Sequence, residues 1–263
     1  DFSEDFGEGD DQSIDTQIWH PLIDGSIMNR KKDPTIAEGQ AGRGYGFYTD
    51  GKEKSFIEHT FDNYIRGKVS VDFYDDETNI EGRMAQVNLT GIGNEKNSDK
   101  PFTIGLGINQ NKATNGFSNA NYVARIADDG RYLVTEIKRT EGWHTFVLEC
   151  GEEGTSLWID EIEVDTSSIP EKDIVTAFKN IQIGDKWAKG GETYFDNIKL
   201  ENMAIVDMGA EEAAKKDASL KTIKVNGFKI PGISSEKTEY IWEWEDLSDL
   251  PEITVETTNP KAK

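Results

Sequence analysis

Between Gly44 and Glu201 the sequence breaks into short runs of strand type, separated by clusters of Gly, Asn and Asp. In the run 68–74, Val69, Val71 and Phe73 alternate with polar residues, which is the period of a strand with one buried face. Such a face needs a second sheet to cover it. The pattern therefore predicts an all-β fold, a jelly-roll β-sandwich.

The expected strands are short and leave little of the chain for helices. We expect strands at residues 46–49, 55–61, 68–74, 83–89, 102–108, 122–126, 132–137, 143–150, 156–159, 162–165, 181–183 and 193–200. Two segments favour helix, 170–178 after a possible N-cap at Ser168 and 208–216 with paired charges. The second segment reads as a stiff connector, so we expect domains at 1–205 and 218–263 joined by a helical linker at 206–217.

The charge of the chain limits its partners. Fifty acidic and 29 basic side chains give a formal net charge of -21, which repels polyanions, so nucleic acid and anionic membranes are poor partners. Cys150 is the single cysteine and lies in an apolar strand, where it is expected to be a packed thiol. No apolar run is long enough to span a membrane, and we expect that any export signal has been removed.

Residues 218–233, ASLKTIKVNGFKIPGI, followed by Tyr240, combine an apolar strand with a hairpin signal at Asn226-Gly227 and a second turn at Pro231-Gly232. This segment resembles the opening of the cadherin-like β-sandwich repeat of bacterial surface enzymes and adhesins. The resemblance implies a partial sandwich at 218–263 and one module of a longer secreted, multimodular bacterial chain. The expected location is extracellular, secreted or at the cell surface.

Residues 141–164, EGWHTFVLECGEEGTSLWIDEIEV, together with Asp5-Phe6 and the run 194–198, resemble laminin-G-like and concanavalin-like jelly rolls. Many members of this group are carbohydrate-binding modules. The resemblance implies a monomeric, non-catalytic module that targets a glycoside hydrolase or polysaccharide lyase to a polysaccharide or oligosaccharide. At Glu161 the chain departs from the group, which usually has Gly at this tight turn, where a type I′ geometry wants positive φ.

Sugar binding needs flat apolar rings beside groups that satisfy hydroxyls. The candidate ligand-binding residues are Trp187, Trp19, Tyr45, Arg43, Asn119 and Arg125. Trp187 stands in a glycine-rich loop, where exposure and a tucked anchor are both open. For Trp19 and Tyr45 a role in the core is an open alternative.

The resemblance also implies a structural calcium held by Asp5 and Asp196, because calcium takes hard oxygen ligands. The alternative is that Asp196 caps a turn. A catalytic alternative rests on Glu161, Glu163 and Asp165, which alternate along one strand and suit a retaining glycosidase. A solvated hairpin face explains them equally. A further alternative is a purely structural or adhesive module.

Overall fold

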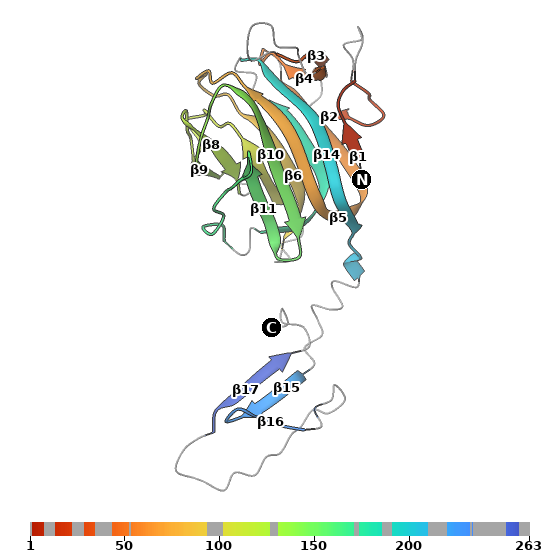
Figure 1. Cartoon of the computed structure of the whole chain (residues 1–263), viewed down its shortest axis with the longest axis vertical. Coiled ribbons are helices and arrows are strands. Elements are labelled where there is room, and N and C mark those ends of the chain that lie inside the picture. Colours follow the sequence, from red (N-terminus) through yellow and green to blue (C-terminus); the bar gives the residue numbers. More distant parts are fainter. Residues whose placement is uncertain are drawn as a thin grey trace. The chain divides into compact units, whose positions relative to one another are not determined.

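The structure is a computed structural model that describes residues 2–7, 14–22, 29–34, 44–52, 54–93, 102–126, 131–170, 174–185, 191–209, 220–231, 233 and 251–257. The chain divides into two compact units, Asp1–Val206 and Asp207–Lys263, each built from antiparallel strands (Figure 1). No helix among the described residues is long and apolar enough to cross a membrane.

One strand, β5 (Ser55–Asp75), organises the first unit because it is 21 residues long and belongs to both layers. Its first part pairs with β13 (Val175–Asp185), and its second part pairs with β10 (Gly142–Gly151) and β14 (Thr193–Ile205). Two strands were expected here, at 55–61 and 68–74. They are continuous because the intervening residues, of which Ile65 and Gly67 are buried and the others are exposed or half-buried, stay extended.

The remaining strands extend each layer from β5. The first sheet contains, in spatial order, β12 (Ile162–Glu163), β11 (Gly154–Ile159), β10, β5, β14, β4 (Tyr45–Thr49) and β3 (Asn29–Lys32), with β1 (Phe2–Glu4) beside β14. The second sheet contains β2 (His20–Pro21), β5, β13, β6 (Ala85–Gly93), β7 (Phe102–Gly107), β8 (Asn121–Arg125) and β9 (Tyr132–Lys138). All pairings are antiparallel, for example between β6 and β7.

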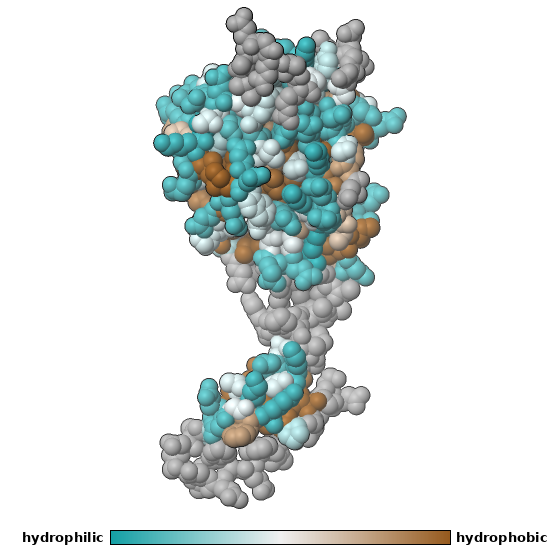
Figure 2. Space-filling model, viewed as in Figure 1, coloured by the Kyte–Doolittle hydropathy of each residue, from teal (hydrophilic) through white to brown (hydrophobic). Residues whose placement is uncertain are grey.

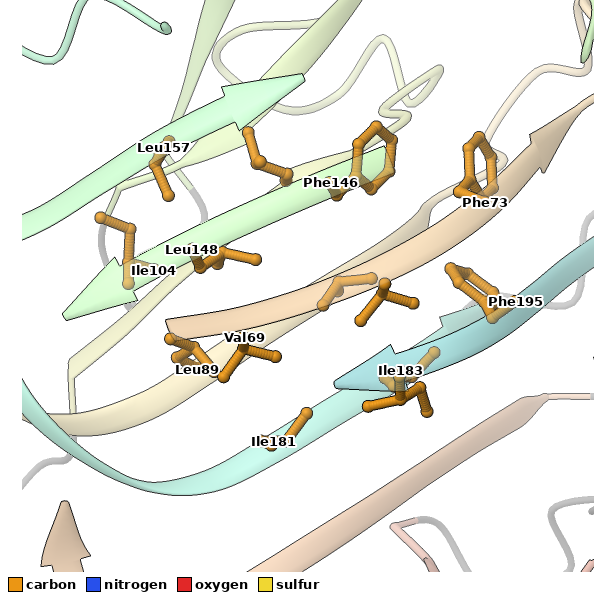
Figure 3. Packing of buried hydrophobic residues seen from close by; sticks show 14 of the residues in the cluster. Val69, Phe73, Leu89, Ile104, Phe146, Leu148, Leu157, Ile181, Ile183 and Phe195 are labelled. Atoms are coloured by element: carbon orange, nitrogen blue, oxygen red, sulfur yellow. The ribbon is translucent and has the colours of Figure 1, made fainter. Parts of the chain in front are cut away.

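The core lies between the two sheets. Alternate residues of β5, β10 and β14 point inward, and they meet alternate residues of β6, β7 and β13 (Figure 3). Val69, Phe73, Phe146 and Phe195 are fully buried, and the ring centroids of Phe73 and Phe146 lie 5.1 Å apart. The structure confirms the predicted all-β jelly-roll sandwich, since period-two alternation drives both layers to bury one face.

One secondary-structure prediction is wrong. The segment 170–178 was expected to be helical, but Val175 to Phe178 begin β13. Val175 and Phe178 are buried in the core, and residues of this segment pair with Gly93 and Ile92 of β6. Cross-strand packing of β-branched and aromatic side chains outweighs the local N-cap signal at Ser168.

The turn between β11 and β12 has the geometry that the sequence predicts. Asp160 and Glu161 both have positive φ, 50° and 68°, so the two-residue loop is a type I′ turn. The Asp160 carboxylate accepts a hydrogen bond from the Thr145 backbone N–H at 2.8 Å. The Glu161 carboxylate accepts no such bond from any described residue, and Glu161 carries the strain of a side chain in the left-handed region.

The second unit contains three described strands, with β15 (Leu220–Val225) between β16 (Phe228–Lys229) and β17 (Ile253–Thr257). Asn226 and Gly227 connect β15 to β16 with φ of 46° and 80°, which is the type I′ hairpin expected from Asn-Gly. The linker predicted at 206–217 lies mostly outside the described residues. The cadherin-like identity of this unit and the domain boundaries stay predictions.

Replacing Glu161 by Gly is expected to stabilise the first unit by about 1 kcal/mol, because glycine adopts positive φ without the clash of a Cβ atom. Urea denaturation of both proteins measures the difference. Glu163→Gly is the matched control, since Glu163 lies in β12 and has no positive φ. That control is expected to destabilise the chain, and a Glu161→Gly protein no more stable than the parent contradicts the strain.

Candidate functional site

Strand β6 is buried on both faces. Val87 and Leu89 point into the core, whereas Gln86, Asn88 and Thr90 alternate with them and therefore point away from it. The exposed fractions of these three outward residues are only 5%, 1% and 7%. An outward face of a two-layer sandwich is normally wet, so a buried row of polar side chains marks this face as unusual.

The strand register places further polar residues beside β6. Asn88 pairs with Gln182 of β13 on one side and with Gly105 of β7 on the other. Gly105 pairs with Arg125 of β8, and Arg125 pairs with Tyr132 of β9. These residues form one row across five neighbouring strands.

The row continues at its other end toward β2. Gln182 pairs with Glu58 of β5, and Glu58 pairs with His20. With neighbouring strands about 4.8 Å apart, Glu58 and Arg125 are separated by about 19 Å. The row is therefore long enough to follow several units of an extended polymer.

Two side chains of the row, Asn88 and Tyr132, are connected by hydrogen bonds through Gln86, which lies two residues before Asn88 on β6. Asn88 Nδ2 donates to Gln86 Oε1 at 3.3 Å, and Gln86 Nε2 donates to the Tyr132 hydroxyl at 3.1 Å. Because the Tyr132 oxygen accepts this bond, its own proton remains available to another acceptor. We call Gln86, Asn88, Arg125 and Tyr132 the amide–tyrosine cluster.

The amide–tyrosine cluster keeps unused hydrogen-bonding capacity. Among the residues that the structure describes, Asn88 Oδ1 and Arg125 Nε are buried and have no hydrogen-bond partner. An unsatisfied buried polar group costs about 1–3 kcal/mol. The cluster therefore holds an unpaired acceptor, an unpaired cationic donor and a hydroxyl proton that Gln86 does not use.

Glycines provide the room for this cluster. A Cβ atom on Gly105 would lie 2.1 Å from Asn88 Oδ1, and one on Gly107 would lie 2.1 Å from the Ala85 carbonyl oxygen. Any side chain at Gly105 would displace the Asn88 amide. The absence of side chains at these two positions also lets the Tyr132 side chain reach back from β9 to Gln86 on β6.

Burial and nearby polar groups shift the pKa values of two side chains of the row, Tyr132 and Glu58. Burial raises the pKa of Tyr132, against the opposing effects of the Gln86 hydrogen bond and the Arg125 charge, so the hydroxyl is protonated at neutral pH. Burial also raises the pKa of Glu58, although the charge of His20 and the Asn180 hydrogen bond lower it. The face can thus bind hydroxyl groups and donate a proton from Tyr132.

Only one of the residues selected from the sequence belongs to this cluster. Arg125 was selected for its polar setting and lies in the row, whereas Gln86, Asn88 and Tyr132 were missed. Their signal was the alternation of polar side chains with Val87 and Leu89 along β6. That alternation predicts a half-buried strand and does not by itself reveal that the polar face is buried as well.

Trp19 cannot be a sugar platform in this structure, and its selection was wrong. Its side chain is fully buried, its Nε1 donates to Glu4 Oε2 at 3.3 Å, and its ring contacts Phe6 and His59. The open alternative of a core role is the correct one. Although Trp19 has polar neighbours in the sequence, its ring is buried in the core because the fold places Phe6 against it.

Tyr45 and Asn119 lie apart from the cluster. Tyr45 is half-buried on β4 in the first sheet, with the Arg30 guanidinium 5.0 Å from its ring centroid. Asn119 is exposed in a loop, where its backbone carbonyl accepts a hydrogen bond from Arg139 at 3.1 Å. The structure does not bring either residue together with Arg125. Arg43 and Trp187 lie outside the described residues, and their roles stay predictions.

The described residues do not assemble the expected calcium site. Asp5 is exposed and its carboxylate accepts the Gly7 N–H at 3.0 Å, while buried Asp196 accepts the Asn197 N–H at 2.6 Å. No group of three or more His, Cys, Asp and Glu side chains in the described part of the chain is placed to hold a metal ion. Calcium binding stays a prediction.

The alternating acids of the catalytic alternative lie on a solvated surface. Glu161, Glu163 and Asp165 are all exposed at and after the β11–β12 turn. The pKa of Asp165 is lowered by its hydrogen bonds with Ser167, which is turn chemistry. The hairpin-face explanation accounts for these residues.

A second polar group of chemical interest is the pair His144 and Asp160. His144 Nδ1 lies 2.5 Å from Asp160 Oδ2, and Nε2 lies 2.8 Å from the Thr140 carbonyl oxygen and 3.3 Å from the Thr140 hydroxyl. Both partners at the shorter distances accept protons, so both ring nitrogens donate. His144 is therefore a positioned imidazolium that holds the β11–β12 turn, and it is not a base for Thr140.

Searches of family models and of curated proteins give no match to this chain. Several solved structures are similar to it. A carbohydrate esterase of the Shiga toxin-encoding bacteriophage phi24B has 14% identity and a TM-score of 0.47 over 75% of this chain and 95% of that chain. Crh5 transglycosylase has 13% identity and a TM-score of 0.43, over 76% and 83% of the two chains.

A β-1,3-glucanase from Mycobacterium marinum has 12% identity and a TM-score of 0.42, over 76% of this chain and 97% of that chain. These three proteins are named as a carbohydrate esterase, a transglycosylase and a glucanase, and a sialidase of Trypanosoma rangeli is also similar. This finding contradicts the expectation from the sequence that the chain is not an enzyme, and that expectation is withdrawn.

The His144–Asp160 pair makes stability depend on pH. Burial disfavours the imidazolium, but hydrogen bonds to Asp160 and Thr140 outweigh it and raise the pKa of His144 above 6.5. Its contribution is complete below pH 6.5 and is lost as the pH rises through the raised folded-state pKa. Burial raises the pKa of Asp160, but the hydrogen bond with His144 outweighs burial, and the pKa is lowered below 3.8. The contribution of Asp160 to stability is therefore lost only as the pH falls through that lower value.

We therefore expect the urea midpoint of the parent protein to fall above pH 6.5, and the midpoint of His144→Gln to fall less over the same range. A series of midpoints between pH 6 and 9 measures this difference. Parallel curves for the two proteins would show that His144 is not the titrating group.

Proposed function

We propose that the chain is a polysaccharide-cleaving jelly-roll domain and that its substrate binds along the polar row of the second sheet. The observation that carries this proposal is the buried amide–tyrosine cluster, whose unused donors and acceptor point away from the core. Amide, guanidinium and hydroxyl groups in one line match the hydroxyls of an extended sugar chain. The resemblance of residues 141–164 to concanavalin-like jelly rolls agrees with a carbohydrate ligand.

Each residue of the cluster has a distinct part in the proposed reaction. Asn88 Oδ1 accepts a sugar hydroxyl, and Arg125 donates to a sugar oxygen. Tyr132 is the general acid, because its hydroxyl proton is not used by Gln86 and its raised pKa keeps it protonated. It donates that proton to the glycosidic oxygen as the bond to the leaving sugar breaks, a water molecule adds to the anomeric carbon, and the proton that this water loses restores the Tyr132 hydroxyl.

The rest of the row supplies binding beyond the cleavage point. Gln182 and Glu58 are half-buried, and Glu58 accepts a hydrogen bond from Asn180 at 3.3 Å. These groups lie within about 19 Å of Arg125 across the sheet. Their distance favours a polymer over a small sugar, since a monosaccharide cannot reach both ends of the row.

Tyr132→Phe is expected to lower kcat by about 10²–10⁴-fold, because general acid catalysis contributes a factor of this size. The change removes one hydroxyl and keeps the ring. Reducing ends released from a panel of neutral and acidic polysaccharides measure the rate, and ultraviolet absorbance of an unsaturated sugar separates elimination from hydrolysis.

Tyr45→Phe is the matched control, since Tyr45 lies on β4 in the first sheet and is expected to leave the rate unchanged. Arg125→Met is expected to raise KM, because the donor to the substrate is lost. The proposal fails if the purified protein releases no product from any polysaccharide of the panel, or if Tyr132→Phe keeps the full rate.

A further inference from the structure

The outer face of the first sheet carries a second row of side chains that the proposed reaction does not use. In the strand register, Trp158 of β11 pairs with Val147 of β10, Val147 with Ser70 of β5, and Ser70 with Lys199 of β14. Their neighbours along the strands, such as Leu157, are fully buried in the core. The row is therefore on the side of the sandwich opposite to the amide–tyrosine cluster.

One aromatic side chain, Trp158, is partly exposed on this face. Trp158 is half-buried, although it is one of the largest apolar side chains of the unit. Figure 2 shows hydrophilic residues around small apolar areas on the side where β10, β11 and β14 lie in front in Figure 1. An indole held in a regular strand is a rigid, flat surface, which suits the C–H face of a pyranose ring.

Two hollows border Trp158. One, of about 780 Å³, lies over β10, β5 and β14 and is lined by Val147, Ser70 and Lys199. The other, of about 580 Å³, extends toward the β10–β11 turn and is lined by Glu149 and Ser156. Because Trp158 lines both hollows, a ligand on the ring can continue into either one.

Polar groups beside the ring are available to a ligand. The side chains of Ser70, Glu149 and Lys199 and the Trp158 Nε1–H make no hydrogen bond or ion pair with any residue in the described ranges. Lys68 and Glu201 form an exposed ion pair at 3.5 Å, and exposed pairs are weak enough to exchange partners with a ligand. The face offers a hydroxyl, donors and carboxylate acceptors around the indole.

The charges on this face select a neutral ligand. The larger hollow holds two lysines, Lys68 and Lys199, and four acidic residues, Glu149, Asp160, Glu161 and Glu201, so its acidic excess disfavours an acidic ligand. The formal charge of the whole chain is -21, which repels an acidic polymer at longer range. Uncharged hydroxyl groups avoid this repulsion and can bond to both kinds of charged side chain.

We propose that Trp158, Val147, Ser70, Glu149 and Lys199, which we call the Trp158 face, bind a neutral polysaccharide at a site separate from the amide–tyrosine cluster. The indole stacks on a sugar ring, and Ser70, Lys199 and Glu149 bond to its hydroxyls. The site holds the protein on the polymer while a different chain segment occupies the second sheet. Binding here does not require that the cluster cleaves.

The test is affinity electrophoresis of the whole chain in native gels that contain hydroxyethylcellulose, laminarin, glucomannan or galactan. At least one gel is expected to retard the parent protein. Trp158→Ala is expected to weaken that retardation about tenfold or more in apparent Kd, whereas Trp158→Phe keeps most of it because the flat ring remains. Near-ultraviolet circular dichroism and a urea midpoint confirm that each variant is folded.

Tyr132→Phe separates this inference from the proposed function. The inference holds if Tyr132→Phe is retarded like the parent and Trp158→Ala is not. It is overturned if no gel retards the parent, or if folded Trp158→Ala is retarded like the parent. A protein that is retarded through Trp158 but cleaves nothing overturns the proposed function alone.

Discussion

Two-sided burial of β6 is the constraint on which the rest of the structure depends. A strand that packs Val87 and Leu89 into the core and hides Gln86 and Asn88 on its other face must satisfy two environments at once. The apolar face needs a second sheet, and the polar face needs hydrogen-bond partners, because an unpaired buried amide costs about 1–3 kcal/mol. Tyr132 supplies one partner from β9, and Gly105 leaves space for the Asn88 amide.

The same sandwich presents two chemically different outer faces. The second sheet has amides, a tyrosine and an arginine that are largely buried, whereas the first sheet has Trp158 among charged and hydroxyl side chains in the open. Both faces are fixed by β5, which runs through the two layers and sets the register of β10, β13 and β14. A buried polar face suits precise contact with a reacting sugar, and an open aromatic face suits attachment to a polymer.

Much of the fold could be predicted because apolar and polar residues alternate within single short runs such as 68–74, and this alternation indicates a strand without knowledge of its partners. The tight turn at Asp160 and Glu161 was implied by the resemblance to concanavalin-like jelly rolls, and it keeps the type I′ geometry although Glu161 stands where those proteins usually have Gly. The segment 170–178 was misassigned because its partner is β6, which is about 80 residues away in sequence. That long-range pairing outweighs the local N-cap signal at Ser168.

The site was harder to predict than the fold. Gln86, Asn88, Arg125 and Tyr132 come together only through the register of β6, β7, β8 and β9, and exposure cannot be read from residue type. Trp19 illustrates the same difficulty, since its ring packs under Phe6. Aromatic rings were expected to mark the site, whereas the site that we propose is built on buried amides.

The most direct test of the central claim is to follow the side-chain NH₂ signals of Gln86 and Asn88 by ¹⁵N NMR while a polysaccharide fragment is added to Trp158→Ala protein. The account predicts that both signals shift with saturation, because a sugar hydroxyl reaches the Asn88 amide and perturbs its bond to Gln86. Binding that leaves both signals unchanged would contradict a substrate site on the second sheet.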